Sequence, residues 1–304
     1  MKLGVHTSIA GGLHTALVRG QALGCDVIQL FTHAPGRWKA RDLSREEVSL
    51  FRDTALRTGV VPLAIHAAYL INLGTPCPTM GKRSLAALEK ELQHAEILRI
   101  PFVVVHPGAH MGEGEARGLV RVARRLDTLH RRTRGFRTRI LLENTSGQGT
   151  SLGYRFEHLG TLVGRVRDPE RLGVCLDTCH LHAAGYDLRE GYRETLEQLD
   201  RAVGVRLVKV LHLNDSKTRL AGRVDRHQHI GKGTIGRKGF LHLLGDPRFL
   251  DTPMVLETPK GDGDGLHQDR KNLAAVRRLA TAGSDCKAAS CPFHFDISKN
   301  DHEQ

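Results

Sequence analysis

Short apolar runs recur along the whole chain and are separated by longer stretches with the residue types of helices. Each run is four to six residues long and rich in Val, Ile or Leu, as expected for strands that are buried on both faces. The runs are Leu3–His6, Asp26–Phe31, Val61–His66, Phe102–His106, Arg139–Glu143, Gly173–Asp177, Leu207–His212 and Met254–Glu257.

The segments between these runs predict helices and set the number of repeating units. Helical stretches include Arg45–Arg57, Ser84–Leu98, Gly114–Arg132 and Arg189–Val203. The runs end at positions 6, 31, 66, 106, 143, 177, 212 and 257, so successive ends lie 25 to 45 residues apart. This spacing indicates eight β-α units, and eight parallel strands close into a barrel. We therefore predict an α/β fold, a single (β/α)8 TIM barrel.

An open, doubly wound sheet is the competing fold. Such a sheet usually has fewer strands and carries a glycine-rich phosphate loop after its first strand. The segment Ser8-Ile9-Ala10-Gly11-Gly12 stands at that place and matches such a loop poorly. The barrel is the better interpretation.

The periodic pattern stops near residue 280. We expect residues 1–280 to form the barrel domain and residues 281–304 to form a polar, disordered tail. Four metal-capable residues are scattered through this tail with a spacing that fits no standard zinc module, namely Cys286, Cys291, His294 and His302.

Polar residues that can bind metals close six consecutive runs. In a barrel of parallel strands these carboxyl ends converge on one face, where the active sites of this fold lie. A lone His after a strand is usually a hydrogen-bonded core residue, but nine such groups in one cavity would carry a severe desolvation cost without a compensating positive charge. The six residues are His66, His106, Glu143, Asp177, His212 and Glu257, and His180, Asp225 and His227 follow in nearby loops.

Divalent metal ions would supply the missing charge. Imidazole and carboxylate ligands suit zinc first, with manganese or iron as alternatives. Nine ligands are too many for one ion and fit two or three. Three dications would outweigh the four carboxylates of Glu143, Asp177, Asp225 and Glu257, and that surplus suits a phosphodiester substrate.

The overall charge also favours a polyanionic partner. The 304 residues include 45 Lys and Arg against 33 Asp and Glu, a formal net charge of +12. A hydrophobic content of 40% is enough for a real core. The six cysteines form no disulfide framework, the N-terminus lacks a secretory signal, and no apolar stretch is long enough to span a membrane. We expect a cytoplasmic protein with reduced thiols.

Several ordered motifs resemble those of the endonuclease IV family, zinc-dependent enzymes that incise DNA at abasic sites. The resemblance runs from Gly4 to about residue 260. Its motifs are Gly4-Val5-His6-Thr7-Ser8, Tyr69-Leu70-Ile71-Asn72-Leu73-Gly74, His106-Pro107-Gly108, Leu142-Glu143-Asn144-Thr145, Asp177-Thr178-Cys179-His180, His212-Leu213-Asn214-Asp215-Ser216-Lys217, Arg223-Val224-Asp225-Arg226-His227 and Leu256-Glu257-Thr258.

The resemblance implies three zinc ions with defined ligands. The first would be held by His66, His106 and Glu143, and the third by His180, Asp225 and His227. The second would be held by Glu143, Asp177, His212 and Glu257, with Glu143 bridging. Water activated by the zinc ions would then attack phosphorus on the 5′ side of the abasic nucleotide, leaving a 3′-hydroxyl and a 5′ deoxyribose phosphate. Similar enzymes also trim blocked 3′ ends.

The family inserts side chains at the lesion, and the resemblance places Tyr69 and Leu70 at such positions. The sequence departs from the family in the loop Ala34-Pro35-Gly36-Arg37-Trp38, where Gly36 stands in place of the usual polar intercalating residue. Arg37 either substitutes for it or is a surface arginine. We also expect Trp38, Asn72 and Arg226 at the DNA interface.

Three alternatives remain open at this point. A sugar isomerase or epimerase on a related barrel would use Glu143, Asp177, His212 and Glu257 with one metal, but would leave the other five candidates unexplained. A pyrimidine-dimer endonuclease of the same superfamily lacks the loop motifs given above. A catalytically silent DNA-binding protein would be expected to have lost ligands. Because one barrel holds the whole site, we expect a monomer.

Overall fold

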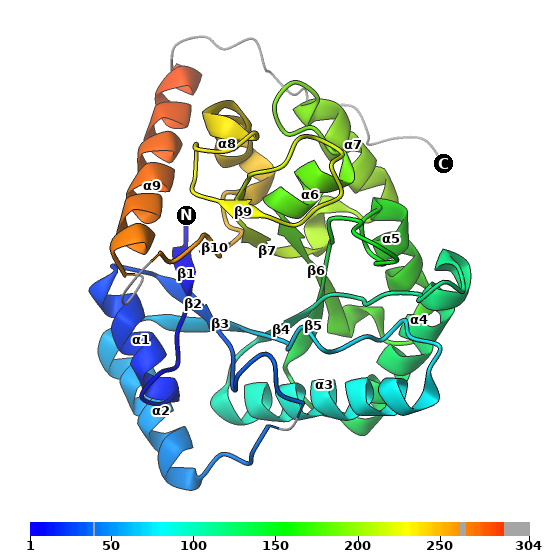
Figure 1. Cartoon of the computed structure of the whole chain (residues 1–304). Helices are drawn as coiled ribbons and strands as arrows, with labels where there is room; N and C mark the ends of the chain where they lie inside the picture. The colour runs from blue at the N-terminus through cyan, green and yellow to red at the C-terminus, as the bar shows by residue number, and fades with distance from the viewer. Residues whose placement is uncertain (39, 262–265, 289–304) are drawn as a thin grey trace, which may run out of the picture.

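The eight apolar runs form the parallel strands of a closed barrel. The computed structural model describes residues 1–38, 40–261 and 266–288, with side chains described as far as residue 282. The strands are β1 (Leu3–Thr7), β2 (Val27–Leu30), β3 (Val61–His66), β4 (Phe102–Val105), β5 (Arg139–Glu143), β6 (Leu172–Asp177), β7 (Val208–His212) and β10 (Met254–Leu256). They pair in the order β1-β10-β7-β6-β5-β4-β3-β2, and β1 closes on β2 (Figure 1). The predicted TIM barrel is confirmed.

Helices surround the barrel as an outer ring (Figure 1). They are α1 (Leu13–Ala22), α2 (Arg45–Thr58), α3 (Pro78–Leu98), α4 (Glu115–Arg132), α5 (Phe156–Arg165), α7 (Tyr192–Ala202), α8 (Gly236–Gly245) and α9 (Leu266–Ala288). The short helix α6 (Thr178–Ala184) lies inside this ring, directly after β6, and is almost entirely buried. Short 3-10 turns lie at Pro169–Arg171, Val205–Leu207 and Pro247–Phe249. A two-stranded antiparallel hairpin of β8 (Asp215–Ser216) and β9 (His227–Gln228) projects from the carboxyl side of β7.

Three helix boundaries differ by more than one residue from those predicted. Helix α3 begins at Pro78, earlier than the predicted Ser84, because a proline at the first helical position costs no hydrogen bond. Helix α7 begins at Tyr192, since the Asp187 carboxylate accepts hydrogen bonds from the amides of Arg189 and Glu190 and holds that segment in a turn.

The third difference concerns the predicted tail. Helix α9 continues to Ala288, eight residues past the predicted boundary at 280, and residues 289–304 lie outside the described part of the chain. Cys291, His294 and His302 therefore lie outside it as well. Among the described residues, every helix is too short or too polar to cross a bilayer.

The interior of the barrel is filled by one layer of small and branched side chains. Its members are Val27, Leu63, Ala64, Val104, Leu141, Cys175, Val210 and Val255, all buried. Because side chains alternate along a strand, the residue two positions later faces the same interior, one step nearer the carboxyl end. For six of the eight strands that next residue is a predicted metal ligand, as in Ala64 and His66 on β3. The apolar layer therefore forms the floor of the site.

Helix α2 fixes the end of the loop that follows β2. The Ser44 hydroxyl accepts a hydrogen bond from the Glu47 amide, and the Glu47 carboxylate accepts one from the Ser44 amide, which is a capping box. Phe51 is fully buried against the core, and Gly59 ends the helix with a left-handed backbone at φ 68°. The β2–α2 loop, residues 31–44, is thus anchored at its second end.

Candidate metal centre

The predicted ligands occupy the carboxyl side of the barrel. His66, Glu143, Asp177 and His212 are the last residues of β3, β5, β6 and β7, and His106 and Glu257 directly follow β4 and β10. His180 lies in the first turn of α6, and Asp225 and His227 lie at the β9 side of the hairpin.

The structure brings all nine residues into overlapping groups whose donor atoms lie within 4.8 Å of one another. Glu143 belongs to two of these groups, which places its carboxylate between them. The groups are His66, His106 and Glu143; Glu143, Asp177, His212 and Glu257; and His180, Asp225 and His227. A fourth combination, Asp177, Cys179 and His227, shares residues with the others.

The carboxylate of Glu143 lies at the centre of the cluster and is fully buried. Its Oε2 atom is 2.9 Å from His66 Nε2 and 3.0 Å from His106 Nε2. Its Oε1 atom is 3.1 Å from His212 Nδ1, which is also 3.2 Å from Glu257 Oε2. Two ligands of one tetrahedral zinc ion are about 3.3 Å apart when each bond is about 2.05 Å. The Glu143 distances are close to that value.

The third group shows the same spacing on the outer side of the cluster. His180 Nε2 is 3.1 Å from Asp225 Oδ2, and His227 Nε2 is 3.3 Å from Asp225 Oδ1. His227 Nε2 is buried and has no hydrogen-bond partner among the described residues. A buried nitrogen that faces two carboxylates and has no hydrogen-bond partner is typical of a metal ligand in the absence of its ion. The residues therefore fit divalent metal ions.

Backbone carbonyls orient the imidazole rings of three of the histidines. The Nδ1 atoms of His66, His180 and His227 donate to the carbonyl oxygens of Ala67 at 2.8 Å, Asn144 at 2.9 Å and Glu257 at 3.0 Å. A ring that donates through Nδ1 keeps the lone pair on Nε2, which is the nitrogen that faces the cluster.

The charges of the cluster compensate one another. Burial would raise the pKa of Glu143, but the neighbouring His106 and His212 hold it well below its ordinary value. Burial would lower the pKa of His212, but Cys175, Glu257 and Glu143 raise it well above its ordinary value. Protons on the imidazoles thus balance the carboxylates in the absence of metal, and metal ions would displace those protons.

The cysteines beside Asp177, Cys175 and Cys179, are free and buried. Burial raises the pKa of Cys175 and that of Cys179 to about 12, so both thiols stay protonated. Cys175 belongs to the apolar floor.

Gln29 on β2 belongs to the site and was not predicted from the sequence. It is fully buried, its Nε2 donates to Glu257 Oε1 at 2.6 Å, and its Oε1 accepts from His212 Nε2 at 2.9 Å. This contact leaves His212 Nδ1 free to face the cluster. Gln29 stands two residues after Val27 of the floor, and this register is the signal that could have revealed it.

Two polar residues of the recognised motifs also have specific positions. Asn214 donates to Asp177 Oδ2 at 2.6 Å and accepts from the Glu257 amide at 2.8 Å, which ties two ligands together. The buried Asp215 carboxylate accepts from the amides of Ser216 at 2.8 Å, Gly233 at 2.9 Å and Ile235 at 3.0 Å. These bonds hold the loop that carries Asp225 and His227.

The residues predicted to contact DNA lie around the same face. Tyr69 is 68% exposed, and its ring packs on Phe31 and His66 with centroids 5.7 and 6.0 Å away. Leu70 and Trp38 are half-buried, and Gly36, Arg37 and Arg226 are exposed. The Asn72 amide oxygen accepts from the amides of Gly74 and Ala109, both at 2.9 Å, so it holds two loops together. These positions leave the predicted DNA contacts as predictions.

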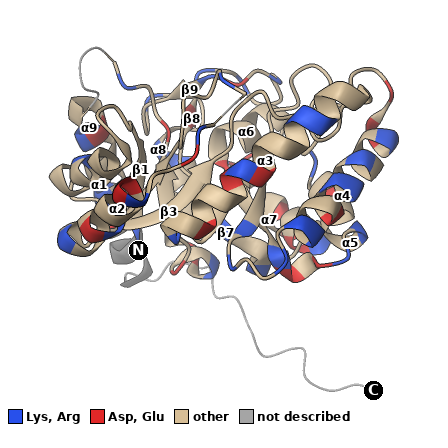
Figure 2. Cartoon of the chain, turned by 90° about the horizontal axis from the view of Figure 1, so that it is seen from below, with Lys and Arg blue, Asp and Glu red and all other residues tan. Residues whose placement is uncertain are grey.

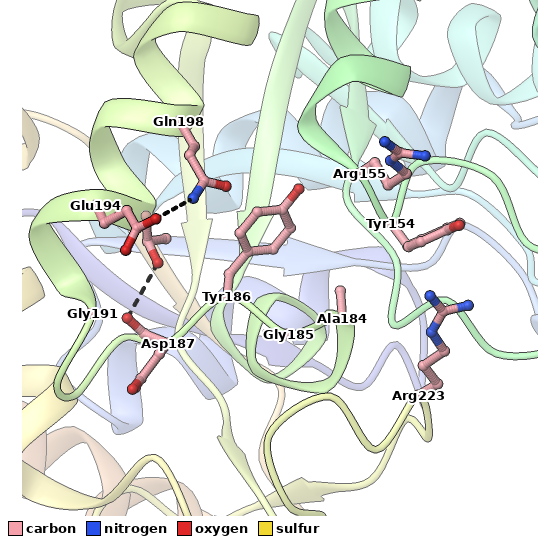
Figure 3. A pocket seen from close by; sticks show the side chains of 11 residues that line it. Tyr154, Arg155, Ala184, Gly185, Tyr186, Asp187, Gly191, Glu194, Gln198 and Arg223 are labelled. Carbon is pink, nitrogen blue, oxygen red and sulfur yellow. Dashed lines mark hydrogen bonds between the residues drawn. The ribbon is translucent and has the colours of Figure 1, made fainter.

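A hollow of about 420 Å³ lies between the start of α5, the end of α6 and helix α7 (Figure 3). The Arg223 guanidinium lies 4.8 Å above the ring of Tyr154, and both line the hollow with Tyr186 at its centre. Asp187 and Glu194 face it from the other side. Its lining residues are distinct from the nine metal ligands, so the hollow is a separate feature of this face.

Comparisons with known proteins identify the family. Residues 18–280 match the family model described as a xylose isomerase-like TIM barrel. A "Probable endonuclease 4" of Chloroflexus aurantiacus is 49% identical over 280 residues, which cover 91% of this chain and 98% of that protein. The crystal structure of endonuclease IV from Thermus thermophilus superposes with a TM-score of 0.82 at 39% identity, covering 93% of this chain and 100% of the other. The chain belongs to the endonuclease IV family.

The barrel itself is shared more widely than the endonuclease IV family. A D-tagatose 3-epimerase-like protein superposes with a TM-score of 0.71, at 19% identity and with 93% of this chain covered. That similarity shows a common fold and carries no argument about chemistry. The assignment of the chain to the endonuclease IV family therefore rests on the sequence identity and on the structural match to endonuclease IV from Thermus thermophilus.

Proposed function

We propose that the protein is a zinc-dependent DNA repair endonuclease that hydrolyses the phosphodiester on the 5′ side of an abasic site in double-stranded DNA. The observation that carries this proposal is the cluster of nine candidate ligands in three groups, two of which share Glu143, in a chain of the endonuclease IV family. Three zinc ions match the number of groups, with manganese or iron as alternatives at some positions. We further propose that the products are a 3′-hydroxyl and a 5′ deoxyribose phosphate, and that blocked 3′ ends are also trimmed.

Bound zinc would lower the pKa of a water molecule and neutralise the charge that develops on the phosphoryl oxygens. The side chains of this protein have positioning roles in that chemistry. The Glu143 carboxylate, buried between two groups, would keep both at a fixed separation. Gln29 and Asn214 would hold Glu257 and Asp177 in place through the hydrogen bonds described above. With the metals in place, no serine, cysteine or lysine nucleophile is required.

Abasic DNA suits a site that lies below the rim of the barrel. A phosphodiester can reach such a site when the duplex bends and the lesion turns outward, which costs least where a base is missing. The exposed ring of Tyr69 and the half-buried Leu70 would fill the gap left in the stack. Arg37, Trp38, Asn72 and Arg226 surround the same face, and Gly36 leaves space at the tip of its loop.

Incubation with a duplex that carries one tetrahydrofuran abasic analogue tests this function, together with metal analysis of the same preparation. We expect one incision 5′ of the analogue and no cleavage of an undamaged duplex of the same sequence. Protein that carries its full metal complement and yet makes no incision would contradict the proposal. Turnover of a ketose by the same preparation would favour a sugar epimerase instead.

Cleavage should weaken steeply as salt is added. Lys and Arg residues occur along α3, α4 and α5 and among the loops near the β8–β9 hairpin (Figure 2), and the chain has a net charge of +12. Because contacts to phosphates release counterions, we expect KM for the abasic duplex to rise at least about tenfold between about 50 and about 200 mM salt. Steady-state kinetics at several salt concentrations measure this. A flat response would mean that the basic residues do not contact the substrate.

Asp215→Asn should loosen the loop that carries Asp225 and His227. An amide has one acceptor oxygen, whereas the carboxylate accepts from several amides of this loop. We expect zinc affinity of the third group to fall about 10- to 100-fold, measured by equilibrium dialysis, with the other groups unaffected. Asp187→Asn, at a carboxylate that caps a turn on the same side, is the matched control and should bind zinc normally.

A further inference from the structure

The β2–α2 loop is held by one face of helix α3. The guanidinium of Arg83 lies 4.5 Å above the ring of Trp38, and Lys90 forms an ion pair with Asp42. Both loop residues lie beyond the exposed tip at Gly36 and Arg37, where an added Cβ on Gly36 would meet no atom within 4 Å. The tip itself is therefore not packed, and its position depends on contacts made further along the loop.

A chain of polar contacts connects the two halves of this loop through helix α3. His33 Nε2 lies 3.0 Å from the Arg37 carbonyl oxygen, and His33 Nδ1 lies 3.2 Å from Glu91 Oε1. Glu91 Oε2 lies 2.6 Å from the Thr32 hydroxyl. That hydroxyl lies 3.2 Å from His94 Nδ1, and His94 Nε2 lies 3.0 Å from the Arg41 carbonyl oxygen. We call Thr32, His33, Glu91 and His94 the α3 relay.

The α3 relay needs protons to make all of its hydrogen bonds. It ends on two carbonyl oxygens, which can only accept. When Glu91 is ionised, two neutral imidazoles and one hydroxyl supply three hydrogens for six contacts, the five above and one of 3.3 Å between the Thr32 hydroxyl and His33 Nδ1. Each proton added to the relay satisfies one further contact. The grip on the loop should therefore depend on protonation.

Burial decides which group of the relay takes up that proton near neutral pH. Glu91 is 1% exposed, and burial raises its pKa to about 7. His94 is 2% exposed, and burial, aided by the positive charge of Lys90, lowers its pKa to about 4, so it stays neutral. Within the relay, His33 also faces Glu91 and His94, and the charged or titratable groups that face it from outside are Asp42 of the loop, Lys90 of α3 and His66 of β3.

We propose that the α3 relay positions the β2–α2 loop against damaged DNA and that its grip weakens when Glu91 loses its proton. The link to DNA rests on the proposed function, whereas the grip on the loop does not. The loop begins at Phe31, whose ring lies 5.7 Å from that of Tyr69 and 5.8 Å from that of His66. The placement of the loop therefore also affects Tyr69, the residue proposed to enter the DNA at the lesion. The pKa of Glu91 is raised in the folded protein, so the stabilisation of the β2–α2 loop by protonated Glu91 is present at low pH and is lost as pH rises through about 7.

Trp38 reports on the loop directly, because it is the single tryptophan of the chain. We expect acrylamide quenching of its fluorescence in the metal-loaded protein to increase about twofold between about pH 6 and about pH 8, with a midpoint near 7. Glu91→Gln keeps the shape of the side chain and cannot titrate, so its quenching should not change with pH. Glu89→Gln is the same substitution on the same helix, at a residue paired with Arg132, and should behave like the parent.

Kinetics on the abasic duplex test the link to DNA. Over the same pH range we expect the ratio of the parent's KM to the KM of Glu91→Gln to rise about fivefold. A change of this size corresponds to the loss of about one hydrogen bond. The ratio of the two kcat values should stay constant. Thr32→Val breaks the relay and should raise KM at every pH, whereas Thr32→Ser retains the hydroxyl and should restore the parent profile. This pair also decides the matter if Glu91→Gln does not fold.

The possible failures are distinguishable. Quenching of Trp38 that does not change with pH in the parent would overturn the α3 relay. Quenching that changes as expected, while KM of the parent and of Glu91→Gln stay equal, would overturn the link to DNA and would count against the proposed function of this loop.

Discussion

Glu143→Gln should reduce cleavage of the abasic duplex by at least about a thousandfold. The substitution keeps the shape of the side chain but removes the negative charge that two groups of ligands share. It also brings an amide group toward the nitrogens of His66 and His106, which lie 2.9 and 3.0 Å from the present carboxylate. Single-turnover cleavage, with metal analysis of the same sample, measures the effect.

DNA binding separates this loss from a general failure of the protein. Because the exposed basic residues are unchanged, affinity of Glu143→Gln for the abasic duplex should stay within about threefold of the parent. Glu197→Gln, on the outer surface of α7, is the matched control and should cleave normally. Cleavage by Glu143→Gln within about tenfold of the parent would refute the bridging position of this carboxylate.

Removal of metal should abolish activity and also lower the thermal stability of the protein. The buried carboxylates and imidazoles of the cluster would then be balanced by protons alone. Ions present at a free concentration of about a thousand times their Kd stabilise the folded state by about 4 kcal/mol. We therefore expect chelation to lower Tm by about 8 °C. Differential scanning fluorimetry before and after chelation measures this shift.

Reconstitution with zinc tests how many ions the cluster holds. We expect activity to return in full after about three ions per chain are added. Calorimetry in buffers of different ionisation enthalpy should show that protons are released during the titration, because the imidazole pKa values are raised in the metal-free cluster. Full activity at one ion per chain would favour the single-metal chemistry of a sugar epimerase.

The barrel and the grouping of the nine candidate ligands could be predicted because both follow from local patterns. Brief apolar runs at regular spacing predict parallel strands, and each ligand on a strand closes such a run, as His66 closes β3 and Asp177 closes β6. The alternation of side chains then brings these ends to one face without any knowledge of the loops. The start of α3 was placed too late because apolar periodicity alone gives Pro78 no weight as a helix start.

Contacts between distant segments could not be predicted in the same way. Thr32 and Glu91 are 59 residues apart in the chain, and each has an ordinary local environment in the sequence. In the sequence Asp215 is one polar residue of a loop, yet its carboxylate accepts hydrogen bonds from backbone amides up to 21 residues away. Gln29 is the intermediate case, because its position two residues after Val27 repeats the offset between the floor and the candidate ligands on the other strands.

The two-residue offset between the floor and the ligands has an evolutionary consequence. Val210 and His212 share one face of β7, yet Val210 packs inside the barrel while His212 reaches the cluster. Stability and chemistry are therefore inherited through different positions of the same strand. A duplicated gene could exchange its ligands for those of another reaction while its floor, and hence its folding, stayed intact. The D-tagatose 3-epimerase-like protein and the endonuclease IV of Thermus thermophilus share this barrel fold.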